Sequence, residues 1–285
     1  MTMTGREPIV ETAWLANHLS APDLAVLDAS WHLPTMNRDA GREFLGEHIP
    51  GAQFFNIDEL CEETSDLPHM LPSTVKFASR MKEMGIGDGV RVVIYDSAGL
   101  FSAARAWWTF RAMGHNDVVV LNGGLPKWRA EGRALEDGRA RQRARTHFTP
   151  RFNAALVADL DDVKGYVASG STQIVDARPV ARFRGEEAEP RPGLRMGHMP
   201  GAKNLPHSRL INPDGTLKSK SEIQEAFANA DVDTKVPMMT TCGSGVTASI
   251  LALALAAIGQ PDVSVYDGSW AEWGQNNGLP VVAEG

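Results

Sequence analysis

Short apolar runs typical of strands alternate along the chain with longer segments of helical pattern. In the second half, the predicted strands are Gln173-Ile-Val-Asp176, Pro237-Met-Met-Thr240 and Val263-Ser-Val-Tyr266. A capping pattern at Ser221-Glu-Ile-Gln224 predicts the start of one helix, and the apolar stretch from Val246 to Ile258 predicts another. Gly259 can end that helix in a left-handed conformation. This alternation indicates an α/β fold with a mainly parallel sheet flanked by helices.

The two halves of the chain resemble each other. His48-Ile-Pro-Gly-Ala52 recurs as His198-Met-Pro-Gly-Ala202, and Leu27-Asp-Ala29 recurs as Val175-Asp-Ala177. From residue 90 onward the halves match at a constant offset of 145, which aligns Trp128 with Trp273. A repeat of this length indicates duplication of a whole domain. We therefore expect two tandem domains at 1–133 and 152–285, separated by a linker at 134–151.

The expected linker is poor in apolar residues and rich in arginine, a composition typical of a solvated segment; a basic docking patch is the alternative. The whole chain is acidic, with a net charge of -7 and a pI near 5.6, which argues against nucleic-acid binding. Its longest apolar stretch, Ile250 to Ile258, is far shorter than a membrane span, and no secretory signal is visible. We expect a cytoplasmic protein that binds neither nucleic acid nor membrane.

Two cysteines, Cys61 and Cys242, are too few for a disulfide framework, so reduced thiols are expected. No CxxC pattern or histidine cluster predicts a metal site, and no GxGxxG fingerprint predicts a nucleotide. The sequence therefore predicts no cofactor.

Cys242 lies in the sequence Thr241-Cys-Gly-Ser-Gly-Val-Thr247, between a predicted strand and a predicted helix. Backbone N–H groups of such a loop, together with the helix dipole, favour a thiolate over a thiol and stabilise a bound anion. The alternative is that Cys242 is a small buried hydrophobic residue. The offset of 145 places Ser97 opposite Cys242, so one repeat keeps the thiol and the other lacks it. This difference favours one catalytic and one supporting domain.

These motifs together, namely the paired HxPGA segments, the CGSGVTA loop and the closing DGSWAEW, resemble the rhodanese superfamily from about Val10 to Val281. The resemblance implies two rhodanese-like domains, the first without the catalytic cysteine, and an enzyme that carries sulfur as a Cys242 persulfide. Thiosulfate-using members typically carry cationic residues after the cysteine, as in CRKGVT. Here those positions are Gly243 and Ser244, so the resemblance implies 3-mercaptopyruvate as the donor, pyruvate as the released product, and cyanide or a thiol such as thioredoxin as the acceptor.

The substrate-binding residues follow from the same resemblance. Its RFRGxExEPR pattern implies that Arg182 and Arg191 hold the donor's carboxylate and carbonyl, while Gly243, Gly245, Val246 and Thr247 shape the binding loop. From the residues alone, arginines interleaved with Glu186, Glu187 and Glu189 are more typical of a solvated, self-paired surface loop.

The resemblance also implies a proton relay. Ser244 matches from the cysteine loop, and His69 and Asp58 match from a segment of the first half. A carboxylate that orients an imidazole next to a hydroxyl is a chemically sensible chain for protonating the departing enolate. A lone histidine before Met-Leu-Pro is also a common loop or packing residue.

Other functions remain open at this point. A thiosulfate sulfurtransferase on the same fold is the nearest alternative, disfavoured by the neutral Gly243-Ser244 pair. A cysteine phosphatase would need an arginine six residues after the cysteine, where this chain has Ala248. A non-enzymatic binding module is disfavoured by the intact loop around Cys242.

Overall fold

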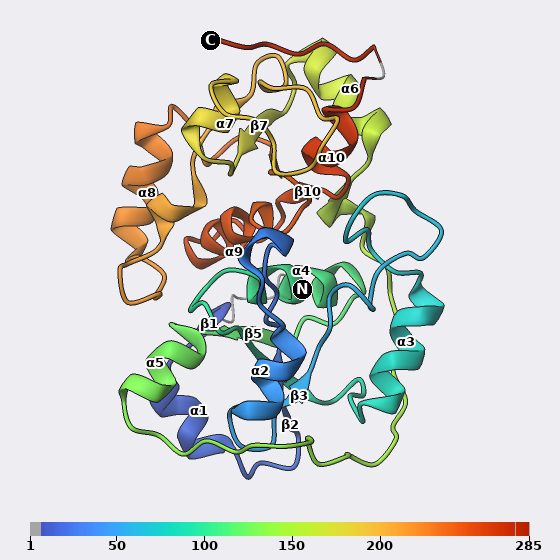
Figure 1. Cartoon of the computed structure of the whole chain (residues 1–285), viewed down its shortest axis with the longest axis vertical. Coiled ribbons are helices and arrows are strands. Elements are labelled where there is room, and N and C mark those ends of the chain that lie inside the picture. The colour runs from blue at the N-terminus through green and yellow to red at the C-terminus, as the bar shows by residue number, and fades with distance from the viewer. Residues whose placement is uncertain (1–6, 277, 285) are drawn as a thin grey trace. The chain divides into compact units, whose positions relative to one another are not determined.

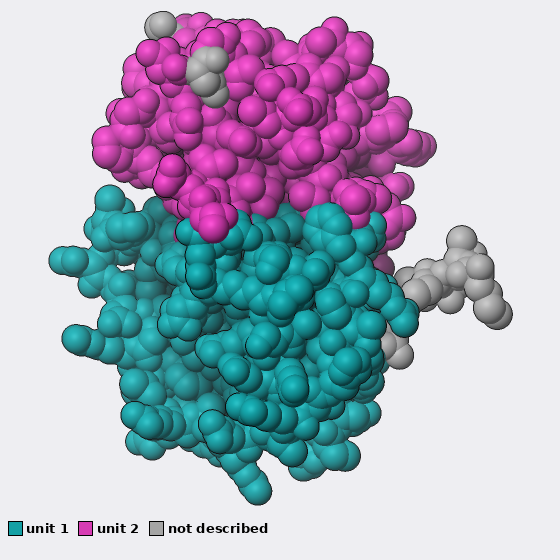
Figure 2. All heavy atoms as spheres, turned by 90° about the vertical axis from the view of Figure 1, so that its right-hand side faces the viewer, with its two compact units in different colours: residues 1–63, 71–153, 212–217 teal, residues 64–70, 154–211, 218–285 magenta. Residues whose placement is uncertain are grey.

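The computed structural model describes residues 7–276 and 278–284. The chain divides into two compact units, coloured separately in Figure 2. Unit 1 contains residues 1–63, 71–153 and 212–217, and unit 2 contains residues 64–70, 154–211 and 218–285. Segment 64–70 is thus part of unit 2 although most of its sequence neighbours belong to unit 1.

Unit 1 is built on a five-stranded parallel sheet with helices packed along it (Figure 1). Its strands, in sheet order, are β1 (Ile9–Val10), β5 (Val118–Leu121), β4 (Arg91–Tyr95), β2 (Leu24–Asp28) and β3 (Gln53–Phe54). Its helices are α1 (Thr12–His18), α2 (Ala40–Gly46), α3 (Thr74–Glu83), α4 (Ala103–Ala112) and α5 (Gly124–Ala130), with a 3-10 turn η1 (Pro34–Met36).

Unit 2 repeats this architecture. Its parallel strands, in sheet order, are β6 (Val157–Ala158), β10 (Ser264–Tyr266), β9 (Met238–Thr241), β7 (Gln173–Asp176) and β8 (Lys203–Asn204). Its helices are α6 (Leu160–Ser169), α7 (Val180–Arg184), α8 (Lys220–Asn229), α9 (Ala248–Ala257) and α10 (Ser269–Trp273), with 3-10 turns η2 (Ala154–Leu156) and η3 (His207–Leu210). The same strand order in both units confirms the expected fold of two tandem parallel-sheet domains.

The apolar patterns account for these elements. The interior strands β2 and β9 are buried along their whole length, as expected for parallel strands covered on both faces. The N-cap of helix α8 lies two residues before the predicted one. Ser219 is its N-cap residue, and the side chain of Glu222 closes a capping box with it, so the prediction at Ser221 is wrong. Gly259 follows α9 with φ +93°, as predicted. Among the described residues, no helix is long and apolar enough to cross a lipid bilayer.

Segment 134–151, the expected linker, packs along unit 1. Arg143 donates hydrogen bonds to the carbonyl oxygens of Leu24 and Pro22, at 2.7 and 3.1 Å. Thr149 bonds the carboxylate of Asp88 through both its N–H and its hydroxyl, at 2.7 Å each. These contacts fix the segment to the unit that precedes it in the chain.

The two HxPGA histidines stabilise corresponding turns. His48 Nδ1 lies 2.8 Å from the carbonyl oxygen of Phe44 and its ring stacks on that side chain. His198 Nδ1 lies 2.8 Å from the carbonyl oxygen of Phe183 and stacks on it in the same way. Both histidines are buried, which gives the repeated motif a packing function.

The aspartates that end β2 and β7 occupy the same repeat position but have different partners. Asp176 is paired with Arg178, two residues later. In unit 1 the residue two positions after Asp28 is Ser30, whose N–H donates to Asp28 at 2.9 Å. Burial without a cation raises the pKa of Asp28 to about 6, an effect that the hydrogen bonds from Ser30 and Tyr95 only partly oppose.

Asp28→Asn tests this effect through the pH dependence of stability. The pKa in the folded protein lies above that of an unfolded aspartate, ~3.9, so wild type loses stability as pH rises from about 4 through about 6. The asparagine cannot ionise and escapes this loss. Relative to wild type, the variant should therefore gain about 2 kcal/mol between pH 4 and pH 7.5, measured by urea unfolding. An equal difference in the free energy of unfolding between variant and wild type at both pH values would contradict the raised pKa of Asp28.

Candidate active site

Cys242 lies directly after β9, which runs between β10 and β7 in the centre of the unit 2 sheet. The loop 242–247 connects this strand to α9. Only 2% of the Cys242 surface is exposed. A thiol is therefore placed at the carboxyl end of a strand and at the N-terminal end of a helix, as predicted from the sequence; the structure adds that this strand is central in the sheet. Binding sites of open α/β sheets typically lie at this edge.

The start of α10 holds the cysteine loop in place. The N–H of Cys242 donates to Ser269 Oγ at 3.3 Å, and that hydroxyl donates in turn to the carbonyl oxygen of Tyr266 at 2.7 Å. The carbonyl oxygens of Cys242 and Gly243 accept from the N–H groups of Trp270 and Ala271, both at 2.9 Å. The DGSW motif thus fixes the backbone on each side of the sulfur, a function that we did not assign to Ser269 from the sequence.

The remaining residues of the loop contribute shape. Gly245 has φ +77°, a left-handed conformation that favours glycine. Its carbonyl oxygen accepts from the hydroxyl of Ser249 in α9 at 2.9 Å. Ser244 and Val246 are buried, and Thr247 precedes α9 without capping it through its side chain.

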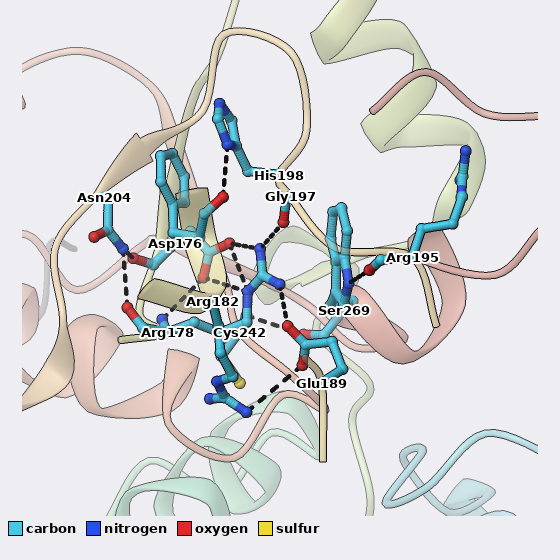
Figure 3. A network of polar contacts seen from close by, with 12 residues as sticks. Asp176, Arg178, Arg182, Glu189, Arg195, Gly197, His198, Asn204, Cys242 and Ser269 are labelled. Carbon is cyan, nitrogen blue, oxygen red and sulfur yellow. Dashed lines mark hydrogen bonds and ion pairs between the residues drawn. The ribbon is translucent and has the colours of Figure 1, made fainter. Parts of the chain in front are cut away.

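A buried ion-pair network lies beside the loop, at the end of β7 (Figure 3). Arg178 is fully buried and bonds both carboxylate oxygens of Asp176, at distances down to 2.7 Å. It also donates to Glu189 Oε1 at 2.6 Å and to the carbonyl oxygen of Gly197 at 2.8 Å. Its guanidinium lies 4.2 Å from the ring centre of Trp270, the residue after Ser269.

Glu189 bridges two arginines. Its second carboxylate oxygen lies 3.6 Å from Arg182 Nη1, and its side chain is only 2% exposed. Figure 3 shows this carboxylate between the guanidinium groups of Arg178 and Arg182. The interpretation of the segment as a solvated, self-paired loop is therefore wrong for Glu189, although Glu186 and Glu187 are exposed. Sequence alone could not distinguish the three glutamates, since only the folded chain shows which of them meets Arg178.

Arg182 lies in α7, and its side chain is 18% exposed. Arg184, on the same short helix, is 50% exposed and pairs with Glu186 and Glu284 at the surface. The two arginines thus lie in different environments, and Arg182 is the one held by the buried network.

Arg191 lies close to both the cysteine loop and His69. Its Nη1 is 3.8 Å from the position that a Cβ atom would take at Gly243. Its Nη2 lies 3.4 Å from His69 Nε2. His69 is 6% exposed and has φ +62°, a left-handed conformation that is uncommon outside glycine. Unit 2 therefore brings together three of the predicted site residues: Arg191, His69 and Gly243.

Asp58 belongs to unit 1, where its carboxylate accepts from the indole N–H of Trp31 at 3.0 Å. The neighbouring thiol of Cys61 donates to the carbonyl oxygen of Asp58 at 2.9 Å, and burial raises the pKa of this thiol. The chain of Asp58, His69 and Ser244 stays a prediction.

His207 is a further titratable group of the site that sequence reasoning did not find. It begins η3, and its Nδ1 lies 3.3 Å from the carbonyl oxygen of Ala177, directly after Asp176. Burial lowers its pKa, and the positive charge of Arg182 lowers it further. Groups of three or more histidine, cysteine or acidic side chains that could hold a metal ion are absent from the described residues.

Comparison with known proteins places the chain in a family. The model of the rhodanese-like domain matches twice, at residues 11–131 and 159–276. The chain belongs to the rhodanese family. The chain is 44% identical to human 3-mercaptopyruvate sulfurtransferase, over 93% of this chain and 91% of the human protein. It is 43% identical to chicken thiosulfate sulfurtransferase, over 93% of this chain and 92% of that protein. These matches confirm the resemblance stated from the motifs.

The fold is likewise shared with a solved structure. SseA from Escherichia coli, described as a 3-mercaptopyruvate sulfotransferase, superposes with a TM-score of 0.85 at 40% identity. The match covers 94% of this chain and all of the SseA chain. Both rhodanese-like domains of the present chain are thus accounted for by one two-domain relative.

The two rhodanese-like domains differ in what occupies the N–H groups of their loops. In unit 1, the carboxylate of Asp96 accepts from the N–H groups of Ala98, Phe101 and Ala103, at 2.7–2.9 Å. The equivalent position in unit 2 is Thr241, and within the described residues no acceptor bonds the N–H groups of Gly243 or Val246. The backbone N–H groups of Gly243 and Val246 are therefore available to an anion, whereas the equivalent N–H groups of unit 1 bond the carboxylate of Asp96.

Arg178→Met tests the buried network. The substitution leaves the carboxylates of Asp176 and Glu189 buried without their shared cation, at an expected cost of about 3–5 kcal/mol in the free energy of unfolding. Arg184→Met is the matched control, because exposed ion pairs contribute about 1 kcal/mol or less. Urea unfolding followed by tryptophan fluorescence measures both. Equal losses in the two variants would show that the network contributes no more than a surface pair.

Proposed function

We propose that the protein transfers sulfur from 3-mercaptopyruvate to a thiol acceptor through a persulfide on Cys242. In the first step, the Cys242 thiolate attacks the donor's sulfur and the carbon–sulfur bond breaks. Its electrons leave with pyruvate enolate, which then takes up a proton. In the second step, an acceptor removes the outer sulfur and regenerates the thiolate. The observation that carries the proposal is the Cys242 loop, with a thiol at a helix N-terminus and available backbone N–H donors.

The choice of donor rests on the charge of the loop. Gly243 and Ser244 carry no charge, so the loop attracts a dianion such as thiosulfate less strongly than a cationic loop does. The names of the relatives support the sulfurtransferase class, and human 3-mercaptopyruvate sulfurtransferase supports the donor. Chicken thiosulfate sulfurtransferase is 43% identical to this chain, almost as similar as the human protein, so thiosulfate is the alternative donor to test.

Arg182 and Arg191 are the proposed binding groups for the donor's carboxylate and carbonyl. Their support is that Arg191 lies beside Gly243 and that Arg182 is held partly buried by Glu189. A guanidinium binds a carboxylate through two parallel N–H donors, which orients the donor as well as attracting it.

For proton delivery we propose His69 and Ser244, oriented by Asp58. The contact between His69 and Arg191 supports the part played by the histidine. As acceptors we propose cyanide or a small protein thiol such as thioredoxin. A cytoplasmic location belongs to the same proposal and is supported by Cys61 and Cys242 being free thiols.

Intact mass spectrometry tests the persulfide directly. After incubation with 3-mercaptopyruvate, wild type should gain the mass of one sulfur atom and release pyruvate, and addition of cyanide should remove that sulfur. Cys242→Ser should gain none, while Cys61→Ser should still gain one sulfur, since burial raises the pKa of the Cys61 thiol and disfavours its reactive thiolate. A faster reaction with thiosulfate would support the alternative donor. Sulfur gained by Cys242→Ser would contradict the mechanism.

Substitutions of Arg191 and His69 should change different kinetic constants although the two side chains are in contact. Arg191→Ala should raise KM for 3-mercaptopyruvate by about 10- to 100-fold, the equivalent of ~1.5–3 kcal/mol for a charged hydrogen bond. His69→Ala should lower kcat by ~10²–10⁴-fold, the usual contribution of a proton-transfer group. Steady-state kinetics with circular dichroism as a folding control measures both. An unchanged KM in Arg191→Ala, or a wild-type kcat in His69→Ala, removes that residue from the proposal.

A further inference from the structure

The buried network at the end of β7 contains equal numbers of positive and negative groups. Asp176 and Glu189 supply two carboxylates, and Arg178 and Arg182 supply two guanidiniums. Asp176 and Arg178 form a bidentate pair with each other. Glu189 is therefore the group that balances the charge of Arg182, the only one of the two arginines that was assigned to the donor.

The position of Glu189 makes its negative charge effective at Arg182. Its side chain is 2% exposed, so water screens its charge poorly. The short bond from Arg178 to Glu189 Oε1, 2.6 Å, holds the carboxylate in one orientation. Its other oxygen, at 3.6 Å from Arg182 Nη1, is in ion-pair range but beyond a short hydrogen bond. Arg182 thus keeps N–H donors for a ligand while the carboxylate of Glu189 lowers the positive potential around it.

We infer that Glu189 is a specificity-determining residue, which lowers the positive potential around Arg182 and so selects a monoanionic donor over a dianionic one. The inference rests on the proposed function, in that Arg182 binds the donor. 3-Mercaptopyruvate carries one negative charge and thiosulfate carries two, so the repulsion from Glu189 acts twice as strongly on thiosulfate. This effect is independent of the neutral Gly243-Ser244 pair, because it comes from a different segment of the chain.

The test compares kcat/KM for the two donors in Glu189→Gln. This substitution removes the charge and keeps the shape of the side chain. The ratio of thiosulfate to 3-mercaptopyruvate activity should rise by about tenfold, the order expected for one poorly screened unit charge near the donor. The rise should persist at high ionic strength, because mobile ions screen a buried charge much less than an exposed one. A purely structural role of Glu189 would lower both activities together and leave their ratio unchanged.

Two further variants make the comparison decisive. Glu187→Gln removes a charge from an exposed position two residues away and should leave the ratio at the wild-type value. Glu189→Asp keeps the charge with a shorter side chain, so its ratio should stay near that of wild type even where KM changes. If Glu189→Gln does not fold, this aspartate variant still tests the inference, since a ratio raised as far as tenfold would make geometry, not charge, the cause.

The outcomes separate this inference from the proposed function. Turnover of 3-mercaptopyruvate by wild type decides the proposed function. An unchanged ratio in a folded Glu189→Gln protein, or an equal rise in Glu187→Gln, overturns the inference about Glu189 while leaving the sulfur transfer intact.

Discussion

The buried guanidinium of Arg178 is the interaction around which the candidate site is arranged. It joins the end of β7, through Asp176, to the segment that carries Glu189, and it packs on Trp270 at the start of α10. The same helix start holds the backbone of Cys242. One fully desolvated cation therefore connects the segment that carries Glu189 to the loop that carries Cys242. Its charge is acceptable in the core only because two carboxylates and a carbonyl oxygen satisfy it.

The two units share one fold but differ in the charged groups at the ends of β2 and β7 and in the loops that correspond to each other. In unit 1, Asp28 is followed two residues later by Ser30 and not by an arginine, and the carboxylate of Asp96 accepts from the loop N–H groups. In unit 2, Arg178 accompanies Asp176, and Thr241 has no carboxylate to bond the N–H groups of the Cys242 loop. The difference between the domains is thus larger than the exchange of cysteine for Ser97. It includes the buried charges beside the loop and the acceptors of the loop N–H groups.

The sequence was sufficient for those features that local pattern and repetition determine. The duplication, the parallel sheets and the position of Cys242 after a strand all follow from apolar runs and from the constant offset between the halves. Most of the features that it could not predict depend on contacts between distant segments. Nothing local distinguishes Glu189 from Glu186, for example. The cap of α8 is a local exception, because Ser219 and Ser221 are both plausible N-cap residues. The pairing of Arg191 with His69 joins residues 122 positions apart.

Segment 64–70 has a consequence for the organisation of the chain. It leaves unit 1 after Glu63, contributes His69 to unit 2, and returns to unit 1 at Leu71. The half of the gene that encodes Cys242, Arg182 and Arg191 therefore does not encode every residue that unit 2 contains. A protein begun at residue 152 would keep Cys242, Arg182 and Arg191 but lack His69, which lies within 3.4 Å of Arg191. The duplicated halves are separable as repeats of sequence, whereas unit 2 is completed by a segment encoded in the first half.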